Sequence, residues 1–156
     1  MFRVLFLCTG NSARSQMAEG LLSWKGKGRL QAESAGSHPA ARVNPHAIET
    51  LREHGVPWAG HAPRGVAGLE REPWNLVVTV CDHAQESCPI FPGQAVMAHW
   101  SMPDPAEVAG DAAKRAAFGD AFVLLSRRID LLLALPLEKL ERGALAAQVG
   151  AIGEAT

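Results

Sequence analysis

The stretch FRVLFLCTGNSARS, residues 2–15, decides the fold of this chain. Its first part, Phe2 to Leu7, is a nearly continuous apolar run, which is typical of a short β-strand buried on both faces. The run leads directly into Cys8 and a series of small or polar residues. Helical periodicity follows, because Met17 and Leu21 are spaced to lie on one face of a helix. The stretch therefore predicts a buried strand, a tight polar loop and a helix in immediate succession.

Strands and helices alternate along the rest of the chain. Further strands are expected at Leu30 to Ser34, at Leu76 to Val80 and, more weakly, near residues 95–98. Helices are expected from Asn44-Pro45, from about Pro105 and in an additional C-terminal segment from about residue 137. The long helix has an apolar face made of Phe118, Phe122, Leu125, Ile129 and Leu132. This alternation predicts a single α/β domain over residues 1–156, with a parallel sheet and helices on both faces.

Composition and charge exclude several classes of protein. The chain has 156 residues, of which 47% are hydrophobic and 20% charged, as in ordinary globular proteins. Its 15 basic and 16 acidic residues give a net charge of -1, so we expect neither a nucleic-acid partner nor a membrane partner. No apolar run approaches the roughly 20 residues of a membrane span, and the first residues do not resemble a secretory signal. The three cysteines argue against a secreted disulfide framework and favour a reducing cytoplasm.

The loop after the first strand has the pattern Cys8-x5-Arg14-Ser15, which suits the binding of a tetrahedral oxyanion. Backbone N–H groups can surround the anion, and the following helix adds its positive N-terminal end. Arg14 would complete the ring with a forked pair of hydrogen bonds, and Ser15 would hydrogen-bond the Cys8 thiolate, which is the attacking form. The alternative is a buried cysteine at an ordinary turn. The residues expected to supply the N–H groups are Thr9, Gly10, Asn11, Ser12 and Ala13.

Two further cysteines occur as Cys81-x6-Cys88, directly after a predicted strand. They are interpreted either as two unrelated buried thiols or as a redox pair, which would need a local rearrangement to join. His83 and His99 lie nearby, but the spacing does not match the close ligand pairs of structural zinc sites, so we expect no metal site.

Asp104 precedes a proline and has two interpretations. It is either a general acid held over the anion site or a cap at the start of the next helix, and the residue pattern alone favours the cap. Glu19 and Ser34 are candidates for a supporting role behind the loop, although surface positions are the default for such residues.

Four segments together resemble the thioredoxin-coupled arsenate reductases, which are built on the low-molecular-weight protein tyrosine phosphatase fold. They are residues 4–19, 34–36, 78–89 and 99–106, within a resemblance that covers about residues 2–135. It implies a three-layer, four-stranded parallel sheet flanked by helices, with flavodoxin-like topology. It also implies that Asp104 is the general acid.

The resemblance implies a mechanism as well. Cys8 would attack arsenate while Asp104 protonates the leaving oxygen. Cys81 would then attack the Cys8 sulfur and release arsenite, and Cys88 would take over the disulfide from Cys8. Thioredoxin would reduce the resulting Cys81–Cys88 disulfide with electrons from NADPH through thioredoxin reductase, so no bound cofactor is expected.

The chain departs from this family at one expected ion site. Many members hold potassium near the anion loop, and Asn11, Glu19 and Ser34 correspond to its ligands. A further acidic ligand is expected in residues 61–64, but Arg64 stands there instead. The sequence therefore leaves open whether potassium binds or whether Arg64 supplies a positive charge in its place.

Two other functions compete with arsenate reduction. A low-molecular-weight phosphatase would share Cys8, Arg14 and Asp104, but such enzymes usually resemble Asp-Pro-Tyr at the acid. Here the residues are Asp104-Pro105-Ala106, and the chain has no tyrosine. A thiol-based arsenic sensor would need a DNA-binding element or a basic patch, and neither is evident. We expect a monomeric arsenate reductase.

Overall fold

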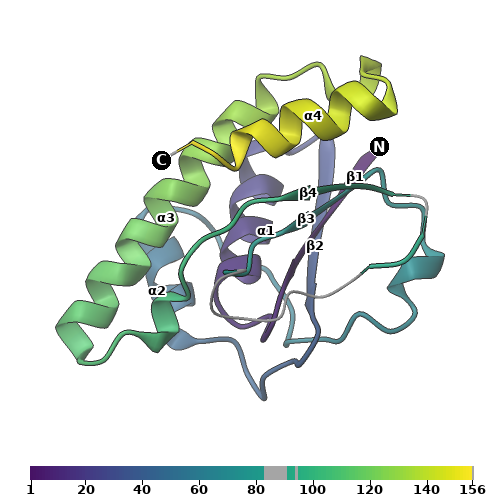
Figure 1. Ribbon diagram of the computed structural model, residues 1–156. Coiled ribbons are helices and arrows are strands. Elements are labelled where there is room, and N and C mark those ends of the chain that lie inside the picture. The colour runs from purple at the N-terminus through teal and green to yellow at the C-terminus, as the bar shows by residue number, and fades with distance from the viewer. Residues whose placement is uncertain (83–90, 94, 156) are drawn as a thin grey trace.

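The computed structural model describes residues 1–82, 91–93 and 95–155 (Figure 1). Four strands are present: β1 (Phe2–Cys8), β2 (Leu30–Gly36), β3 (Leu76–Thr79) and β4 (Val96–His99). The α-helices are α1 (Arg14–Lys25), α2 (Pro45–Glu53), α3 (Asp111–Leu133) and α4 (Arg142–Ile152). Short 3-10 turns are η1 (Leu69–Arg71), η2 (Pro105–Glu107) and η3 (Leu137–Lys139).

The four strands form one parallel sheet in the order β2-β1-β3-β4. Strand β1 therefore lies between β2 and β3, at the point where the strand order reverses. Ligands of open α/β sheets bind at the carboxyl ends of strands at such a point. In this chain that position is Cys8, which is paired with Gly36 at the end of β2. The predicted parallel α/β fold is confirmed, with a flavodoxin-like strand order.

Both faces of the sheet are buried, but they are covered differently. Val4 and Phe6 of β1 face a large core that includes residues from all four α-helices. Leu5 and Leu7 face the opposite side, where a smaller core includes Trp74 and other residues of the segment around η1. Among the described residues, all four α-helices contribute to the first core and only the short turn η1 to the second, so the predicted α-helices on both faces are seen on one. Burial on both faces explains why β1 is almost entirely apolar.

Local signals place several helix ends. The Asn44 side chain accepts a hydrogen bond from the His46 N–H at 2.9 Å, so α2 begins where the Asn-Pro pair predicts. The long helix begins later than predicted, at Asp111. The Asp104 side chain instead caps the short turn η2, and Gly110 has a positive φ of 88° before α3 starts. The apolar face of α3 is buried as expected.

The predicted C-terminal segment forms η3 and α4, and α4 packs against β4 (Figure 1). The indole N–H of Trp100 donates to the carbonyl of Val149 at 2.9 Å. Gly153 approaches the chain after β4 closely, because a Cβ at this position would lie within 3.1 Å of Trp100. None of the helices in the described ranges is both long and apolar enough to cross a membrane.

Candidate functional site: an anion loop at the carboxyl edge of the sheet

Residues 8–14 form a loop, here called the anion loop, between β1 and α1. The chain that follows β2 hydrogen-bonds its outer side through backbone N–H groups. Four loop carbonyls, those of Cys8, Thr9, Gly10 and Ser12, accept from Ser37, His38, Ala40 and Asn44 at 2.8–3.2 Å. Asn11 makes the turn inside the loop with a positive φ of 49°. The loop is therefore fixed by its own backbone.

With these carbonyls directed outward, peptide N–H groups of the loop can point toward its interior. The N–H of Asn11 does so, because its nitrogen lies 3.2 Å from Cys8 Sγ. Gly36 makes this arrangement possible: a Cβ there would lie 2.5 Å from the Thr9 carbonyl oxygen and 2.9 Å from the Asn11 nitrogen. The backbone at the end of β2 thus approaches the loop more closely than any other residue type allows.

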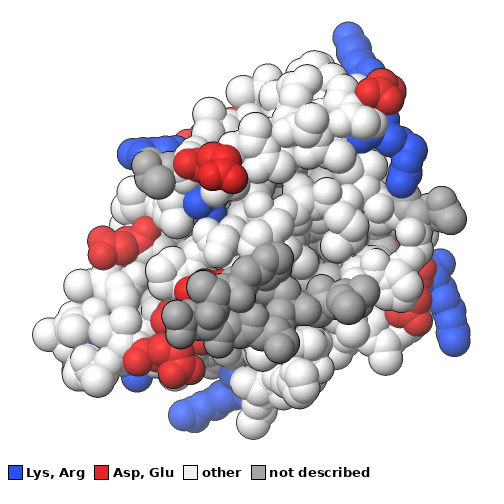
Figure 2. Space-filling view, in the orientation of Figure 1, with Lys and Arg blue, Asp and Glu red and all other residues white. Residues whose placement is uncertain are grey.

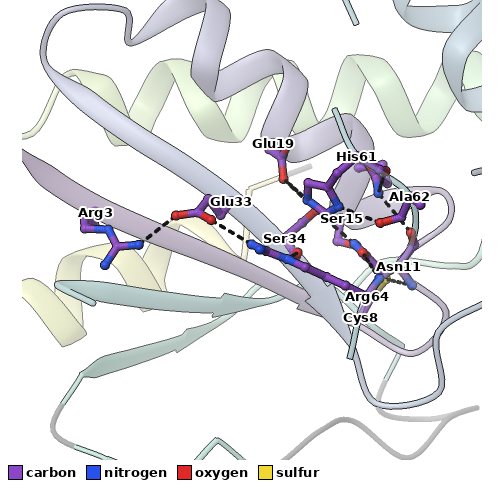
Figure 3. A network of polar contacts seen from close by, with 11 residues as sticks. Arg3, Cys8, Asn11, Ser15, Glu19, Glu33, Ser34, His61, Ala62 and Arg64 are labelled. Atoms are coloured by element: carbon purple, nitrogen blue, oxygen red, sulfur yellow. Dashed lines mark hydrogen bonds and ion pairs between the residues drawn. The ribbon is translucent and has the colours of Figure 1, made fainter. Parts of the chain in front are cut away.

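Cys8 is buried, is a free thiol and has a polar partner on α1. Its Sγ lies 2.9 Å from the Ser15 Oγ, and that oxygen accepts a hydrogen bond from Asn11 Nδ2 at 2.8 Å. Ser15 Oγ accepts from Asn11, and its own hydrogen is available for the contact with Cys8 (Figure 3). The Cys8 sulfur thus has the Ser15 hydroxyl and the Asn11 N–H within hydrogen-bond distance.

A cavity of about 670 Å³ opens beside the Cys8 sulfur and joins the two sides of the site. It is lined by the anion loop and by Asp82, Pro103, Asp104 and Glu107. Arg14 is buried and spans both sides: Nη1 donates to the Met102 carbonyl at 3.2 Å, and Nη2 lies 3.6 Å from Asp104 Oδ2. These residues can bind a small oxyanion between a thiolate and a carboxyl group.

The two interpretations of Asp104 are compatible with each other. Its Oδ1 accepts from the Ala106 N–H at 3.0 Å and caps η2, while Oδ2 faces Arg14 at the cavity. The cap therefore orients the carboxyl group toward the anion loop. The sequence alone does not show that both roles hold together, because either the cap or the general acid by itself explains an Asp-Pro pair.

The mouth of the cavity is acidic. Asp82, Asp104 and Glu107 contribute carboxylates, and no aromatic residue is among the described residues that line the cavity. Figure 2 shows acidic side chains gathered near the N-terminal end of α3. Such a mouth disfavours large anionic substrates and offers no flat apolar wall for a substrate ring.

The second cysteine of the predicted set, Cys81, is fully buried and follows the end of β3. Strands β1 and β3 are adjacent and pair Leu7 with Thr79, so Cys8 and Cys81 lie at the same edge of the sheet. The neighbouring residue Asp82 lines the cavity that contains Cys8. The third cysteine, Cys88, lies outside the described residues, as does His83.

Glu19 and Ser34 are buried, so the default expectation of surface positions is wrong for both. Ser34 Oγ donates to Glu19 Oε1 at 2.8 Å and accepts from Asn11 Nδ2 at 2.9 Å (Figure 3). The loop is thus connected through Asn11 and Ser34 to α1 and β2. Burial beside polar partners explains why these hydrophilic residues lie inside the fold.

Two residues of this network were missed by the sequence reasoning. His61 Nε2 lies 2.9 Å from Glu19 Oε1. Gln16 Nε2 donates to the carbonyl of His61 at 2.9 Å and to that of Asn11 at 3.3 Å. His61 is far in sequence from both Glu19 and Gln16, so no local pattern predicts these contacts. For Gln16, its position directly after the Arg14-Ser15 pair was the one available hint.

The residues at the expected ion site do not fit potassium. A potassium ion needs carbonyl, amide or hydroxyl oxygens with free lone pairs and no competing positive charge. Here the Arg64 N–H donates to Asn11 Oδ1 at 3.1 Å, and Arg64 Nε donates to the Ser34 carbonyl at 2.9 Å. The backbone N–H and the guanidinium of Arg64 therefore each occupy an oxygen that faces this region, and the guanidinium adds a charge of the same sign as the ion.

The fold and the anion loop together define the class to which this chain belongs. Residues 3–142 match the family described as low molecular weight phosphotyrosine protein phosphatase, and the chain is a member of that family. The resemblance inferred from the sequence is confirmed.

Within the family, the chain is similar to proteins named arsenate reductase. It is 42% identical over 106 residues to arsenate reductase 2 of Staphylococcus epidermidis, across 66% of this chain and 78% of the relative. An arsenate reductase structure from Archaeoglobus fulgidus has a TM-score of 0.66 and 31% identity, covering 81% of this chain and 98% of that one. The structure of a thioredoxin-dependent arsenate reductase from Corynebacterium glutamicum has a TM-score of 0.65 and 27% identity. The match covers 85% of this chain and 60% of that one.

Proposed function

We propose that this protein is an arsenate reductase that uses Cys8, Cys81 and Cys88 in sequence. The observation that carries the proposal is a buried free thiol inside an anion loop, with a second cysteine at the end of the adjacent strand. A phosphatase needs the first thiol only. The names of the relatives support arsenate as the oxyanion.

The first step is nucleophilic attack on arsenic. The anion loop and Arg14 bind arsenate through its oxygens, and the Cys8 thiolate attacks the arsenic atom. A sulfur–arsenic bond forms and an arsenic–oxygen bond breaks. Asp104 gives its proton to the departing oxygen, which leaves as water.

The second step is the reduction itself. The Cys81 thiolate attacks the Cys8 sulfur, forming a disulfide and breaking the sulfur–arsenic bond. The electron pair of that bond goes to arsenic, so As(V) becomes As(III) and leaves as arsenite. The two thiols together lose the two electrons that arsenic gains.

The third step regenerates Cys8. The Cys88 thiolate attacks the Cys81 sulfur, frees Cys8 and leaves a Cys81–Cys88 disulfide. A thioredoxin dithiol then reduces this disulfide, with NADPH and thioredoxin reductase as the electron source. The thioredoxin-dependent relative from Corynebacterium glutamicum supports this donor. Reduced thiols of this kind persist in the cytoplasm, which we propose as the compartment of a monomeric enzyme without a bound cofactor.

Phosphomonoester hydrolysis is the second candidate function, because the family is named for a phosphatase and the chemistry of Cys8, Arg14 and Asp104 is shared. The lining of the cavity argues against it as the main activity. Its mouth is acidic and has no aromatic wall among the described residues. We expect at most slow hydrolysis of small aryl phosphates.

The test is steady-state oxidation of NADPH that depends on arsenate. Thioredoxin with thioredoxin reductase is compared with a glutaredoxin–glutathione system at equal donor concentration. We expect turnover with thioredoxin and none for Cys8→Ser. If neither donor system gives oxidation that depends on arsenate, the proposed function is wrong.

The relay has its own test in the variants Cys81→Ser and Cys88→Ser. Both are expected to stop turnover while leaving arsenate binding intact, because neither thiol belongs to the anion loop. Cys88→Ser is expected to release arsenite once per enzyme, whereas Cys81→Ser releases none. A Cys88→Ser variant that turns over at the parent rate with thioredoxin would contradict the relay.

A further inference from the structure

Arg64 occupies a position from which it holds the back of the anion loop. Its Nε donates to the Ser34 carbonyl at 2.9 Å, and its Nη2 pairs with Glu33 Oε1 at 2.8 Å (Figure 3). Its backbone also joins β2, because the Gly36 N–H donates to the Arg64 carbonyl at 2.9 Å. Side chain and backbone thus fix Arg64 to the end of the strand that supports the loop.

The Arg64 backbone N–H determines the orientation of the Asn11 amide. It donates to Asn11 Oδ1 at 3.1 Å, which turns Asn11 Nδ2 toward the two hydroxyl groups of Ser15 and Ser34. Ser15 in turn is hydrogen-bonded to Cys8. Displacing Arg64 would therefore release the amide that orients the partner of the nucleophile.

The two carboxylates near Ser34, those of Glu19 and Glu33, favour a positive charge behind the anion loop. Glu19 is buried beside Ser34, and Glu33 is one residue away with a side chain 24% exposed. Burial alone would raise the pKa of Glu33, but hydrogen bonds from Arg64 and Arg3 outweigh it, and the pKa lies below its usual value. Both carboxylates are accommodated by side chains of the protein itself, His61 for Glu19 and the two arginines for Glu33.

We infer that the Arg64 guanidinium takes the place of a bound potassium ion behind the anion loop, and that Arg64 is a positioning residue for Cys8. The resemblance to the family implies a charge supplied by a bound ion at this place, whereas here a positive charge is covalently attached to the chain. It is also attached in a fixed direction, since the guanidinium donates to both Ser34 and Glu33. The inference rests on the proposed arsenate reduction for its kinetic readout only.

The experiment compares the parent with Arg64→Met and Arg64→Asp in potassium chloride and in choline chloride at equal ionic strength. The parent is expected to have the same kcat/KM for arsenate in both salts. Arg64→Met is expected to lose about tenfold in kcat/KM in either salt, because it loses the side-chain contacts to Ser34 and Glu33 that fix the backbone N–H holding the Asn11 amide. Arg64→Asp restores a carboxylate without the guanidinium, so it is expected to lose activity in choline and regain it in potassium.

Potassium dependence separates this role from a merely structural one, since a variant that is only destabilised gains nothing specific from potassium. Arg3→Met is the matched control. Arg3 binds the other oxygen of Glu33 at 2.8 Å, and the same guanidinium nitrogen bonds Glu72, which is not part of the anion loop. Its removal should therefore leave kcat/KM near the parent value in both salts.

A second readout does not need arsenate reduction. The midpoint of thermal unfolding is measured for the parent and for Arg64→Asp in the same two salts. Potassium is expected to raise the midpoint of Arg64→Asp and to leave that of the parent unchanged, because a ligand stabilises only a fold that binds it. Activation or stabilisation of the parent by potassium, or an Arg64→Met variant with parent activity, would overturn the inference. If neither the parent nor any variant reduces arsenate, the proposed function is wrong. The unfolding comparison then tests the inference about Arg64 by itself.

Discussion

The two sides of the anion cavity are built in different ways. The outer side of the anion loop is held by backbone groups, through N–H groups between residues 37 and 44 and the close approach of Gly36. The opposite side is the segment 99–107, here called the acid segment, which carries Asp104. Its first residues are held by side chains and by the C-terminal region of the chain. The comparison shows that the outer side of the loop is fixed by backbone contacts at the sheet edge, whereas the acid segment depends on side chains and on the packing of the C-terminal region.

Arg128 of α3 is the main support of the acid segment. It is buried, and its three nitrogens donate to the carbonyls of Ser101, Gly153 and Ala155 at 3.0–3.1 Å. Burial lowers the pKa of Arg128 from its usual value, partly opposed by the charge of Glu154. The family match ends at residue 142, whereas α4 continues to Ile152. The acid segment is therefore joined to a part of the chain beyond the family match.

The largest effect is expected from Asp104→Asn. Asparagine keeps an oxygen that can cap η2 but cannot supply the proton, so turnover should fall by about 10²–10⁴-fold while arsenate binding changes little. The measurement is kcat for arsenate reduction together with the dissociation constant for arsenate. A variant with parent kcat would remove Asp104 from the mechanism, and Asp104→Ala, which also loses the cap, shows what the cap adds.

Gly36→Ala tests the anion loop in isolation. The added Cβ would lie 2.5 Å from the Thr9 carbonyl oxygen, so the loop must move. Overpacking of this kind costs about 1–3 kcal/mol, and we expect a similar loss in the free energy of unfolding and weaker arsenate binding. The matched control is Gly119→Ala in α3, where a Cβ meets nothing within 4 Å and should be neutral or slightly stabilising. Equal behaviour of the two variants would contradict the close fit at Gly36.

Arg128→Met tests the acid segment in the same way. Three carbonyls lose their donor, so stability should fall by roughly 1–3 kcal/mol and kcat several-fold, with arsenate binding unchanged. Arg128→Lys should recover only part of the lost stability and of the lost kcat, because lysine lacks the planar, forked guanidinium. In an Asp104→Asn background the loss in kcat should disappear, since there is no acid left to position. Additive losses in kcat would show that Arg128 acts on stability alone.

The smallest effect is expected from Glu138→Gln, on the exposed pair between Arg29 and Glu138. The hydrogen bond from Arg29 lowers the pKa of Glu138 below its usual value near 4.5. A lowered pKa means that the ionised carboxylate stabilises the fold. This contribution is complete above the usual pKa and is lost as the pH falls through the lowered one. The unfolding midpoints of parent and variant should therefore differ slightly at neutral pH and converge in acid.

Local sequence was sufficient for the parts of the site that are contiguous. The strand, the anion loop and the helix follow one another within residues 2–25, so apolar patterning and a cysteine–arginine spacing predict both the element and the chemistry of Cys8 and Arg14. The parallel order and the position of Cys81 at the same edge followed from the alternation of strands and helices.

Only the tertiary structure decided the polar network behind the loop. Arg64 reaches Ser34 across 30 residues, Glu33 across 31 and Asn11 across 53. Such contacts exist because the chain at Gly65 lies beside the end of β2, which itself pairs with β1, and no local pattern encodes them. The same holds for Arg128, which meets Ser101 and Gly153 only once α3 and α4 have packed. The sequence by itself thus determined which residue attacks and where it lies, while packing between distant segments decided which side chains hold it in place.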